Sequence, residues 1–152
     1  MSLAAAVAQE ANIDLRSVML LRHASGKVDA LLAHGASIEE YTLLQPTDSK
    51  YDFHATNRGP IQVVAVVVNG KLHALYRIAG VKRIGTTHSL ASPAFLRFDK
   101  AMHYGPRPAK LFSGRELSSN LVGRAVEGWS SPRNAVARFN GKLFREVCFA
   151  KS

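Results

Sequence analysis

The chain has 152 residues, of which 47% are hydrophobic and 20% are charged, and its formal net charge at pH 7 is +9. This balance is typical of a globular protein and excludes a disordered one, and the length suits a single domain. No apolar run reaches the roughly 18 residues of a membrane helix, so we expect no association with a membrane. Cys148 is the only cysteine, which excludes an intrachain disulfide and fits a cytoplasmic protein.

The positive charge is concentrated in the second part of the chain. Residues 61–152 contain 15 Lys and Arg against four acids, whereas residues 1–60 contain five Lys and Arg against seven acids. Lys and Arg supply most of the non-specific affinity of proteins for nucleic acid, because they neutralise phosphates. The charge pattern therefore indicates a nucleic-acid partner, although it says nothing about the fold.

The front of the chain favours short helices around one strand. The Ala-rich segment 3–11 follows no basic region and predicts a helix rather than a signal peptide. Residues 17–22 form a short apolar run that predicts the first strand. Residues 27–34 predict a short helix that Gly35 ends.

A capping box predicts the start of a further helix. Ser37 is followed three residues later by Glu40, so segment 37–44 is expected to begin a helix, and Pro46 is expected to end it. Residues 47–60 are polar and predict a loop.

Asn69-Gly70 gives the clearest structural signal. It separates two β-rich runs, 61–68 and 71–78, and Asn-Gly suits the tight type I′ turn of a β-hairpin. Because residues 63–68 are almost all valine, we expect this strand to be buried on both faces.

A second Asn-Gly pair, Asn140-Gly141, predicts a second hairpin. Its strands would be residues 133–139 and 142–149, which alternate between apolar and polar side chains. Residues 121–129 predict one more strand, and Gly and Pro mark residues 105–108 as an irregular excursion.

Together these elements predict an α+β fold that is mainly β: a small, partly closed antiparallel β-barrel with short N-terminal helices. Parallel strands would need crossover helices between them, and the strand-rich second part offers little room for these. We expect a single domain, 1–152, in which a helix-leaning front, 1–60, packs on a β-barrel portion, 61–150.

Motifs for cofactors and metals are missing from the sequence. It contains no phosphate-binding loop, no dinucleotide fingerprint and no two histidines four residues apart. The four acids of the basic part are too few for a convincing two-metal nuclease centre. We therefore expect no cofactor, no metal and no catalytic residue.

The candidate binding residues are basic and polar side chains near the ends of predicted strands and in the excursion. Arg and Lys hold phosphates, Arg can also read guanine, and a tyrosine can stack on a base. Lys82 and Arg83 are expected at a strand exit, and Tyr104 is the best stacking candidate. The predicted nucleic-acid-binding set is Lys82, Arg83, Thr86, His88, Tyr104, Arg107, Lys110, Arg133, Arg138 and Arg145.

Several short motifs, taken in order, resemble a known family. They are Leu20-Leu21-Arg22-His23, Ile38-Glu39-Glu40-Tyr41 with Gln45, Leu75-Tyr76-Arg77-Ile78-Ala79-Gly80, and Leu121-Val122-Gly123-Arg124-Ala125-Val126 with Trp129. This order is similar to the N-terminal, non-catalytic region that precedes the catalytic module in some bacterial GIY-YIG nuclease family proteins of the restriction type. The likeness covers about residues 15–147.

The resemblance implies a domain that engages DNA without cutting it. A separate nuclease or methyltransferase subunit would then supply the catalysis. Ala74-Leu75-Tyr76 and Arg83-Ile84-Gly85 echo the two signature triplets of the catalytic module, but the second tyrosine is missing and the spacing is too short. The expected barrel also looks like PUA-like and B3-like nucleic-acid-binding barrels, a likeness of architecture alone.

The sequence thus predicts a non-enzymatic nucleic-acid-binding domain, with duplex DNA favoured over RNA. The first alternative is a small metal-dependent nuclease or hydrolase built on His23, Glu39 or Glu40, and Arg77. The second is a protein-interaction module whose basic face meets an acidic partner.

Overall fold

The computed structural model describes residues 1–47, 61–129 and 135–151. The chain divides into two compact units that interleave along the sequence. The described residues of unit 1 are 1–24, 61–78, 115–129 and 135–151, and those of unit 2 are 25–47 and 79–114. Each unit therefore combines residues from the near-neutral front with residues from the basic part.

Unit 1 is built on strands β1 (Val18–His23), β3 (Val63–Val68), β7 (Val136–Ala137) and the first half of β4 (Lys71–Thr86). The strand predicted at residues 17–22 is therefore confirmed as β1. β1 pairs with β3 in parallel and with β7 antiparallel, and β3 pairs with β4 antiparallel.

The parallel pair corrects the expectation of a purely antiparallel sheet. A parallel connection needs a crossover segment, usually helical. Here the crossover lies in the front of the chain, where helices α2 (Ser25–Ala33) and α3 (Ile38–Leu43) separate β1 from β3. The antiparallel expectation rested only on the lack of room for crossover helices in the strand-rich second part of the chain.

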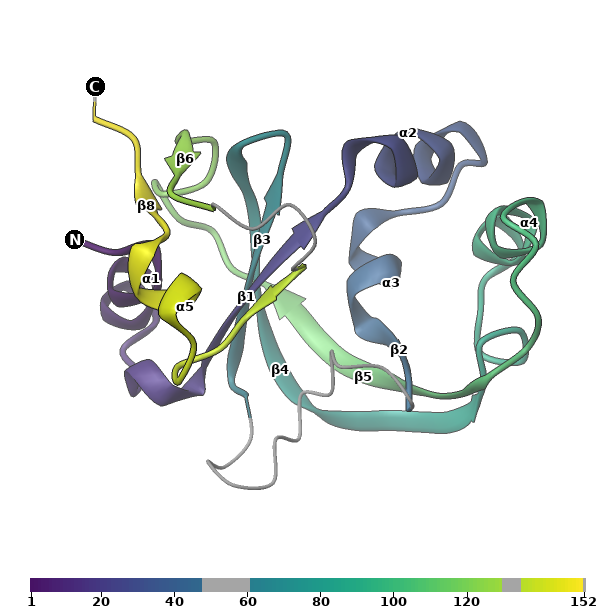
Figure 1. Ribbon diagram of the computed structural model, residues 1–152. Helices are drawn as coiled ribbons and strands as arrows, with labels where there is room; N and C mark the ends of the chain where they lie inside the picture. The colour runs from purple at the N-terminus through teal and green to yellow at the C-terminus, as the bar shows by residue number, and fades with distance from the viewer. Residues whose placement is uncertain (48–60, 130–134, 152) are drawn as a thin grey trace. The chain divides into compact units, whose positions relative to one another are not determined.

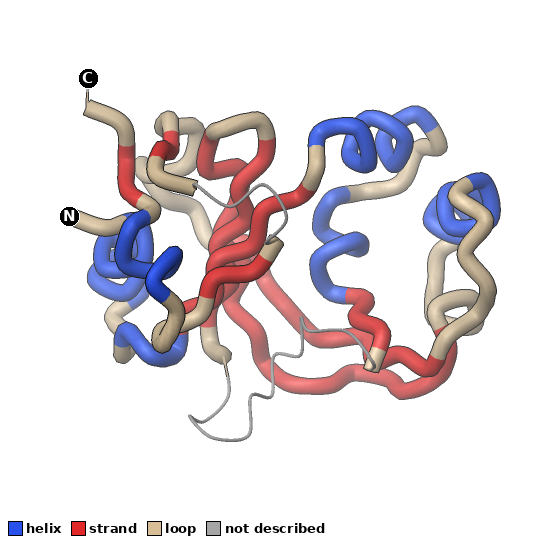
Figure 2. Tube along the Cα trace, viewed as in Figure 1, coloured by secondary structure: helices blue, strands red, loops and turns tan. Residues whose placement is uncertain are grey.

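The first hairpin is confirmed. Asn69 and Gly70 have φ angles of 53° and 71°, as a type I′ turn requires. All six residues of β3 are buried, as the run of valines predicted. β4 continues well past the predicted end at residue 78, as one uninterrupted strand in Figure 2. Lys82 and Arg83 therefore lie within β4 and not at a strand exit.

Helices α1 (Leu3–Ala11) and α5 (Lys142–Glu146) lie side by side next to strand β8 (Cys148–Phe149) (Figure 1). The helix predicted from the Ala-rich segment is confirmed as α1, which the Ser2 side chain caps by accepting a bond from Ala5 N at 3.1 Å. A 3₁₀ turn, Leu15–Ser17, leads into β1. The unit 1 core contains Leu3 and Val7 of α1, alternate residues of β1 and β3, and Phe144 of α5.

The second predicted hairpin is wrong. Asn140-Gly141 forms a turn, but residues 142–146 continue as helix α5 rather than as a strand. Phe144 is 1% exposed, and burial of this ring in the core outweighs the local alternation that suggested a strand. β8 instead pairs with β6 (Val126–Glu127).

Of the strand predicted at residues 121–129, only the two residues of β6 form a strand. The Ser119 hydroxyl accepts a bond from Leu121 N at 3.1 Å, and Gly123 has a φ of 96°. Both features fold residues 119–124 into turns.

Unit 2 contains helices α2 and α3, strand β2 (Leu44–Pro46), helix α4 (Pro93–Ala101), most of strand β5 (Pro108–Glu116) and the second half of β4. Helix α2 ends before Gly35, whose φ is 78°, and the Ser37 hydroxyl caps α3. Both of these predictions are confirmed. Helix α4 and most of β5 were not predicted.

Six strands form one hydrogen-bonded sheet in the order β2-β5-β4-β3-β1-β7, and β6 and β8 form a separate pair. Within the described residues this sheet has two edges, β2 and β7, so it does not close into a barrel. The coarser prediction, an α+β fold with more strand than helix, is confirmed. Among the described helices, none is long and apolar enough to cross a membrane.

Candidate nucleic-acid interface

Tyr104 of unit 2 lies against two cations. The Lys27 Nζ atom is 5.4 Å from the centroid of the Tyr104 ring and donates a hydrogen bond to the phenol oxygen at 2.9 Å. The Arg107 Cζ atom is 5.6 Å from the same centroid. The hydrogen bond holds the Lys27 ammonium at the hydroxyl end of the ring, and the Arg107 distance is that of a cation–π contact. Tyr104 therefore contacts two positive charges, one from α2 and one from the segment before β5.

The backbone holds Arg107 in place. Thr87 N donates to the Arg107 carbonyl at 2.8 Å, and Arg107 N donates to the Thr87 hydroxyl at 3.1 Å. Thr87 is 3% exposed, so both bonds are shielded from water. The end of β4 thus anchors the start of β5, while the Arg107 side chain remains exposed.

His88 and Asp99 form a buried electrostatic pair beside this arrangement. The Nε2 atom of His88 lies 3.2 Å from Oδ2 of Asp99. Both atoms are buried, and neither makes a hydrogen bond of good geometry. Asp99 also fixes Tyr104, because its carbonyl accepts a bond from Tyr104 N at 3.0 Å. We call Lys27, His88, Asp99, Tyr104 and Arg107 the Tyr104 cluster.

Burial raises the pKa of the Asp99 carboxyl above its ordinary value of 3.8. The charges of His88 and Arg107 oppose this rise, since they favour the ionised carboxylate. Asp99 thus contributes a buried titratable acid that interacts with His88 and Arg107.

Lys82 and Arg83 are exposed on β4 and line a hollow of unit 2, of about 400 Å³. Its opposite wall carries Glu40, whose two carboxylate oxygens accept bonds from Ser92 N at 2.7 Å and from Ser92 Oγ at 2.6 Å. The Glu40 carboxylate is thereby engaged in capping α4. Arg83 lies three residues from Thr86, or roughly 10 Å along an extended strand.

The other predicted residues are distributed over both units. In unit 2, Thr86 exchanges hydrogen bonds with Ser89 in a local turn, and Lys110 is half-buried in β5. In unit 1, Arg138 is half-buried and Arg145 is exposed on α5. Arg133 lies outside the described residues. The structure thus brings His88, Tyr104 and Arg107 together in one cluster, and it assigns Arg138 and Arg145 to the other unit.

The sequence did not point to Lys27 or Asp99 as members of the site. Lys27 lies 77 positions before Tyr104, and Asp99 belongs to a helix that was not predicted. A signal for Asp99 was nevertheless present, since it is the only acid between residues 61 and 115.

Two residues of the enzyme alternative make other contacts. Arg77 of unit 1 donates to the Ala11 carbonyl at 3.1 Å, and Glu40 of unit 2 caps α4 through Ser92. Within the part of the chain that the structure describes, no three His, Cys, Asp or Glu side chains are grouped closely enough to hold a metal ion.

No protein-family model, curated protein or solved structure matches this chain.

Proposed function

We propose that this protein is a nucleic-acid-binding domain, with duplex DNA as the favoured ligand and no catalytic activity of its own. The observation that carries the proposal is the Tyr104 cluster, in which Lys27 and Arg107 both contact the same aromatic residue. The association with a restriction or modification system, and with a separate nuclease or methyltransferase, rests on the resemblance to GIY-YIG nuclease family proteins.

In this mechanism the cluster binds a backbone phosphate. Arg107 presents two N–H groups to the phosphate oxygens, and Lys27 adds a point charge. The half-buried Tyr104 ring offers a surface for a sugar or an exposed base. Because Lys27 is hydrogen-bonded to Tyr104 and Arg107 lies against the ring, less side-chain entropy is lost on binding than for free side chains.

The exposed cations of β4 extend the contact. Lys82 and Arg83 carry the positive charge along the strand that leads to the cluster, and Lys110 adds to it from the neighbouring β5. Contacts of this kind are independent of sequence and set the register of the protein on the nucleic acid.

Fluorescence anisotropy with labelled duplex DNA, single-stranded DNA and RNA over a series of salt concentrations tests the proposal. Roughly six phosphate contacts predict a log–log slope of about −5 on duplex DNA. The charge-neutralising variants Lys27→Gln and Arg107→Gln should each reduce the slope by about 1. The control Lys100→Gln removes a charge of unit 2 that is exposed on α4, outside the cluster, and should leave the slope nearly unchanged.

A slope near zero, or no binding to any of the three ligands at low salt, would contradict the proposal. Incubation of plasmid with the protein and Mg²⁺ or Mn²⁺ tests the enzyme alternative. Cleavage that is lost in His23→Ala would favour a nuclease over a binding domain.

One observation favours the protein-interaction alternative. Ile84 of β4 is 75% exposed and Val81 is 38% exposed, on either side of Lys82 and Arg83. An exposed apolar side chain marks a protein contact when it belongs to a larger apolar patch, and Ile84 is the most exposed candidate on β4. Association with an acidic partner that survives nuclease treatment, is lost in Ile84→Ser and is kept in Lys100→Gln would support this function.

A further inference from the structure

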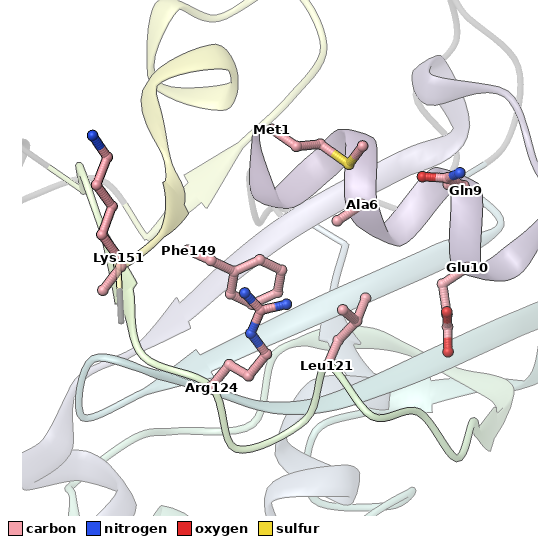
Figure 3. Close-up of a pocket in the computed structure, with 9 residues that line it drawn as sticks. Met1, Ala6, Gln9, Glu10, Leu121, Arg124, Phe149 and Lys151 are labelled. Carbon is pink, nitrogen blue, oxygen red and sulfur yellow. The ribbon is translucent and has the colours of Figure 1, made fainter.

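Unit 1 contains a separate pocket of about 680 Å³ (Figure 3). Its volume lies within the range of small-molecule sites. Helix α1 contributes one wall with Gln9 and Glu10, the turn before β6 contributes Leu121 and Arg124, and Phe149 and Lys151 come from β8 and the residues after it.

Hydrogen bonds between these segments hold the walls of the pocket in place. The Ser119 hydroxyl donates to Glu10 Oε1 at 2.7 Å and so ties the turn to α1. Gly123 N donates to the Leu72 carbonyl at 2.7 Å, and Leu72 N donates to the Arg124 carbonyl at 3.0 Å. The backbone of Arg124 is thus fastened to the first hairpin before any ligand binds.

One side of the pocket is cationic and aromatic. The Arg124 guanidinium lies over the Phe149 ring, with its Cζ atom 4.1 Å from the ring centroid. No acidic side chain within the described residues forms an ion pair with Arg124, so its N–H groups remain for an anion. Lys151, which is exposed and also lines the pocket, adds a second positive charge.

The other side of the pocket offers a neutral amide and an acidic carboxylate as hydrogen-bonding groups. In Figure 3 the Gln9 amide and the Glu10 carboxylate lie across the pocket from Phe149. Glu10 uses Oε1 for Ser119, which leaves Oε2 as an acceptor for a ligand N–H. Leu121 and Ala6 supply apolar surface between the two sides.

We propose that this pocket binds a phosphorylated nucleoside, with guanine as the preferred base. The phosphate would lie against Arg124 and Lys151, because Arg recognises phosphate oxygens through paired N–H donors. Guanine presents N–H donors that suit the remaining acceptor, Oε2 of Glu10, whereas ring N1 of adenine carries no hydrogen to donate. The apolar surface of Leu121 and Ala6 suits the planar base between these two ends.

The same chemistry has two sources, a free nucleotide and the terminal nucleotide of a strand. The inference does not rest on the proposed function, because the pocket belongs to unit 1 and the Tyr104 cluster to unit 2. Variants of the two sites therefore separate the two proposals.

Isothermal titration calorimetry with GMP, AMP, guanosine and inorganic phosphate tests the inference on the full chain. We expect saturable binding of GMP, at least fivefold weaker binding of AMP and weaker binding still of guanosine and phosphate. Arg124→Gln should weaken GMP binding about tenfold, and Glu10→Gln should reduce the preference for GMP over AMP. Arg115→Gln removes an exposed charge of unit 1 outside the pocket and should leave GMP binding unchanged.

A short oligonucleotide with a 5′-terminal guanosine phosphate, compared with GMP, distinguishes the two sources. Tighter binding of the oligonucleotide that is lost in Arg124→Gln assigns the pocket to a strand end, and equal affinity assigns it to the free nucleotide. Lys27→Gln and Arg107→Gln should leave GMP binding unchanged whether or not the proposed function holds.

Three results would overturn the inference: no binding of GMP, equal binding of phosphate and GMP, or binding that Arg124→Gln does not weaken. Phe149→Leu retains apolar volume in the pocket and serves as a second variant if Arg124→Gln does not fold. Thermal melting of each variant establishes that the fold is intact when binding is measured.

Discussion

The Nε2 atom of His88 lies 3.2 Å from Oδ2 of Asp99, a buried carboxyl that also interacts electrostatically with Arg107. The two residues come from different elements, since His88 follows β4 and Asp99 lies near the end of α4. Asp99 also accepts a bond from Tyr104 N, so one acidic residue contacts both the histidine and the aromatic residue of the cluster. The electrostatics of the cluster therefore depend on the protonation of Asp99.

Asp99→Asn should flatten the dependence of stability on pH. Because burial raises the pKa of the Asp99 carboxyl, the folded protein holds this proton over a range above pH 3.8 where the unfolded chain has lost it. In that window the contribution of Asp99 to the free energy of unfolding falls as pH rises. The contribution is therefore most favourable at low pH. Urea unfolding at a series of pH values should show this trend in the wild type and lose it in the variant. An identical pH profile for both proteins would contradict the assignment.

His23 should show the opposite trend. Burial, together with the charge of His73, lowers the pKa of His23 from 6.5 to about 4. As pH falls, the unfolded chain takes up a proton on His23 near pH 6.5, whereas the folded protein does not. The contribution of His23 to the free energy of unfolding is therefore complete above pH 6.5 and is lost as pH falls toward 4. The loss amounts to about 3 kcal/mol.

The variant His23→Gln should remove this part of the pH dependence. Urea unfolding between pH 4 and 7 measures it. His73→Gln is the control, because it removes only the smaller, electrostatic cause of the shift and should leave most of the slope in place. A slope that persists in His23→Gln must come from another group.

Tyr104→Ala should weaken nucleic-acid binding by roughly tenfold, because it removes both the ring surface and the support for Lys27 and Arg107. Tyr104→Phe keeps the ring and loses only the hydrogen bond from Lys27, so we expect about a twofold effect. Fluorescence anisotropy at fixed salt measures both. Equal losses in the two variants would mean that the hydroxyl of Tyr104, and not its ring, supports nucleic-acid binding.

The bond between Glu40 and Ser92 should stabilise unit 2. Ser92 caps α4 by accepting a bond from Phe95 N at 3.2 Å, while its own N–H and hydroxyl donate to Glu40. Ser92→Ala should cost about 1–2 kcal/mol of stability. A double-mutant cycle with Glu40→Gln, followed by urea unfolding, should give a coupling energy above about 0.5 kcal/mol. Additive effects would mean that the two side chains stabilise the protein independently.

Gly128→Ala should be strongly destabilising. Gly128 has a φ of +87°, and a Cβ atom there would lie within van der Waals overlap of the Glu146 carbonyl oxygen. Gly123→Ala is a matched control, since its φ is +96° but no atom lies within 4 Å of its Cβ position. The control should cost about 1–2 kcal/mol from backbone strain alone. Thermal melting should show a clearly larger loss for Gly128→Ala, and equal losses would contradict the steric argument.

The sequence predicted the locally encoded parts of this fold well. The Asn69-Gly70 turn, the Ser37 cap and the end of α2 at Gly35 depend on backbone angles and side-chain bonds within a few residues. Burial of β3 on both faces followed from its valines. These features need no partner elsewhere in the chain.

The candidate site was only partly predictable. His88, Tyr104 and Arg107 were proposed from residue type and position, whereas Lys27 and Asp99 joined them through contacts between distant segments. The pocket around Arg124 was missed for the same reason, because its walls come from opposite ends of the sequence.

By itself the sequence determined the charge imbalance, the α+β class and the first hairpin, because composition and local backbone preference decide these. The tertiary structure decided the parallel pairing of β1 with β3, the helical state of residues 142–146 and the division of the basic residues between two units. Each of these depends on which distant apolar surfaces are buried together, and burial of Phe144 outweighs local propensity. The basic residues of segment 61–152 are therefore divided between the two units.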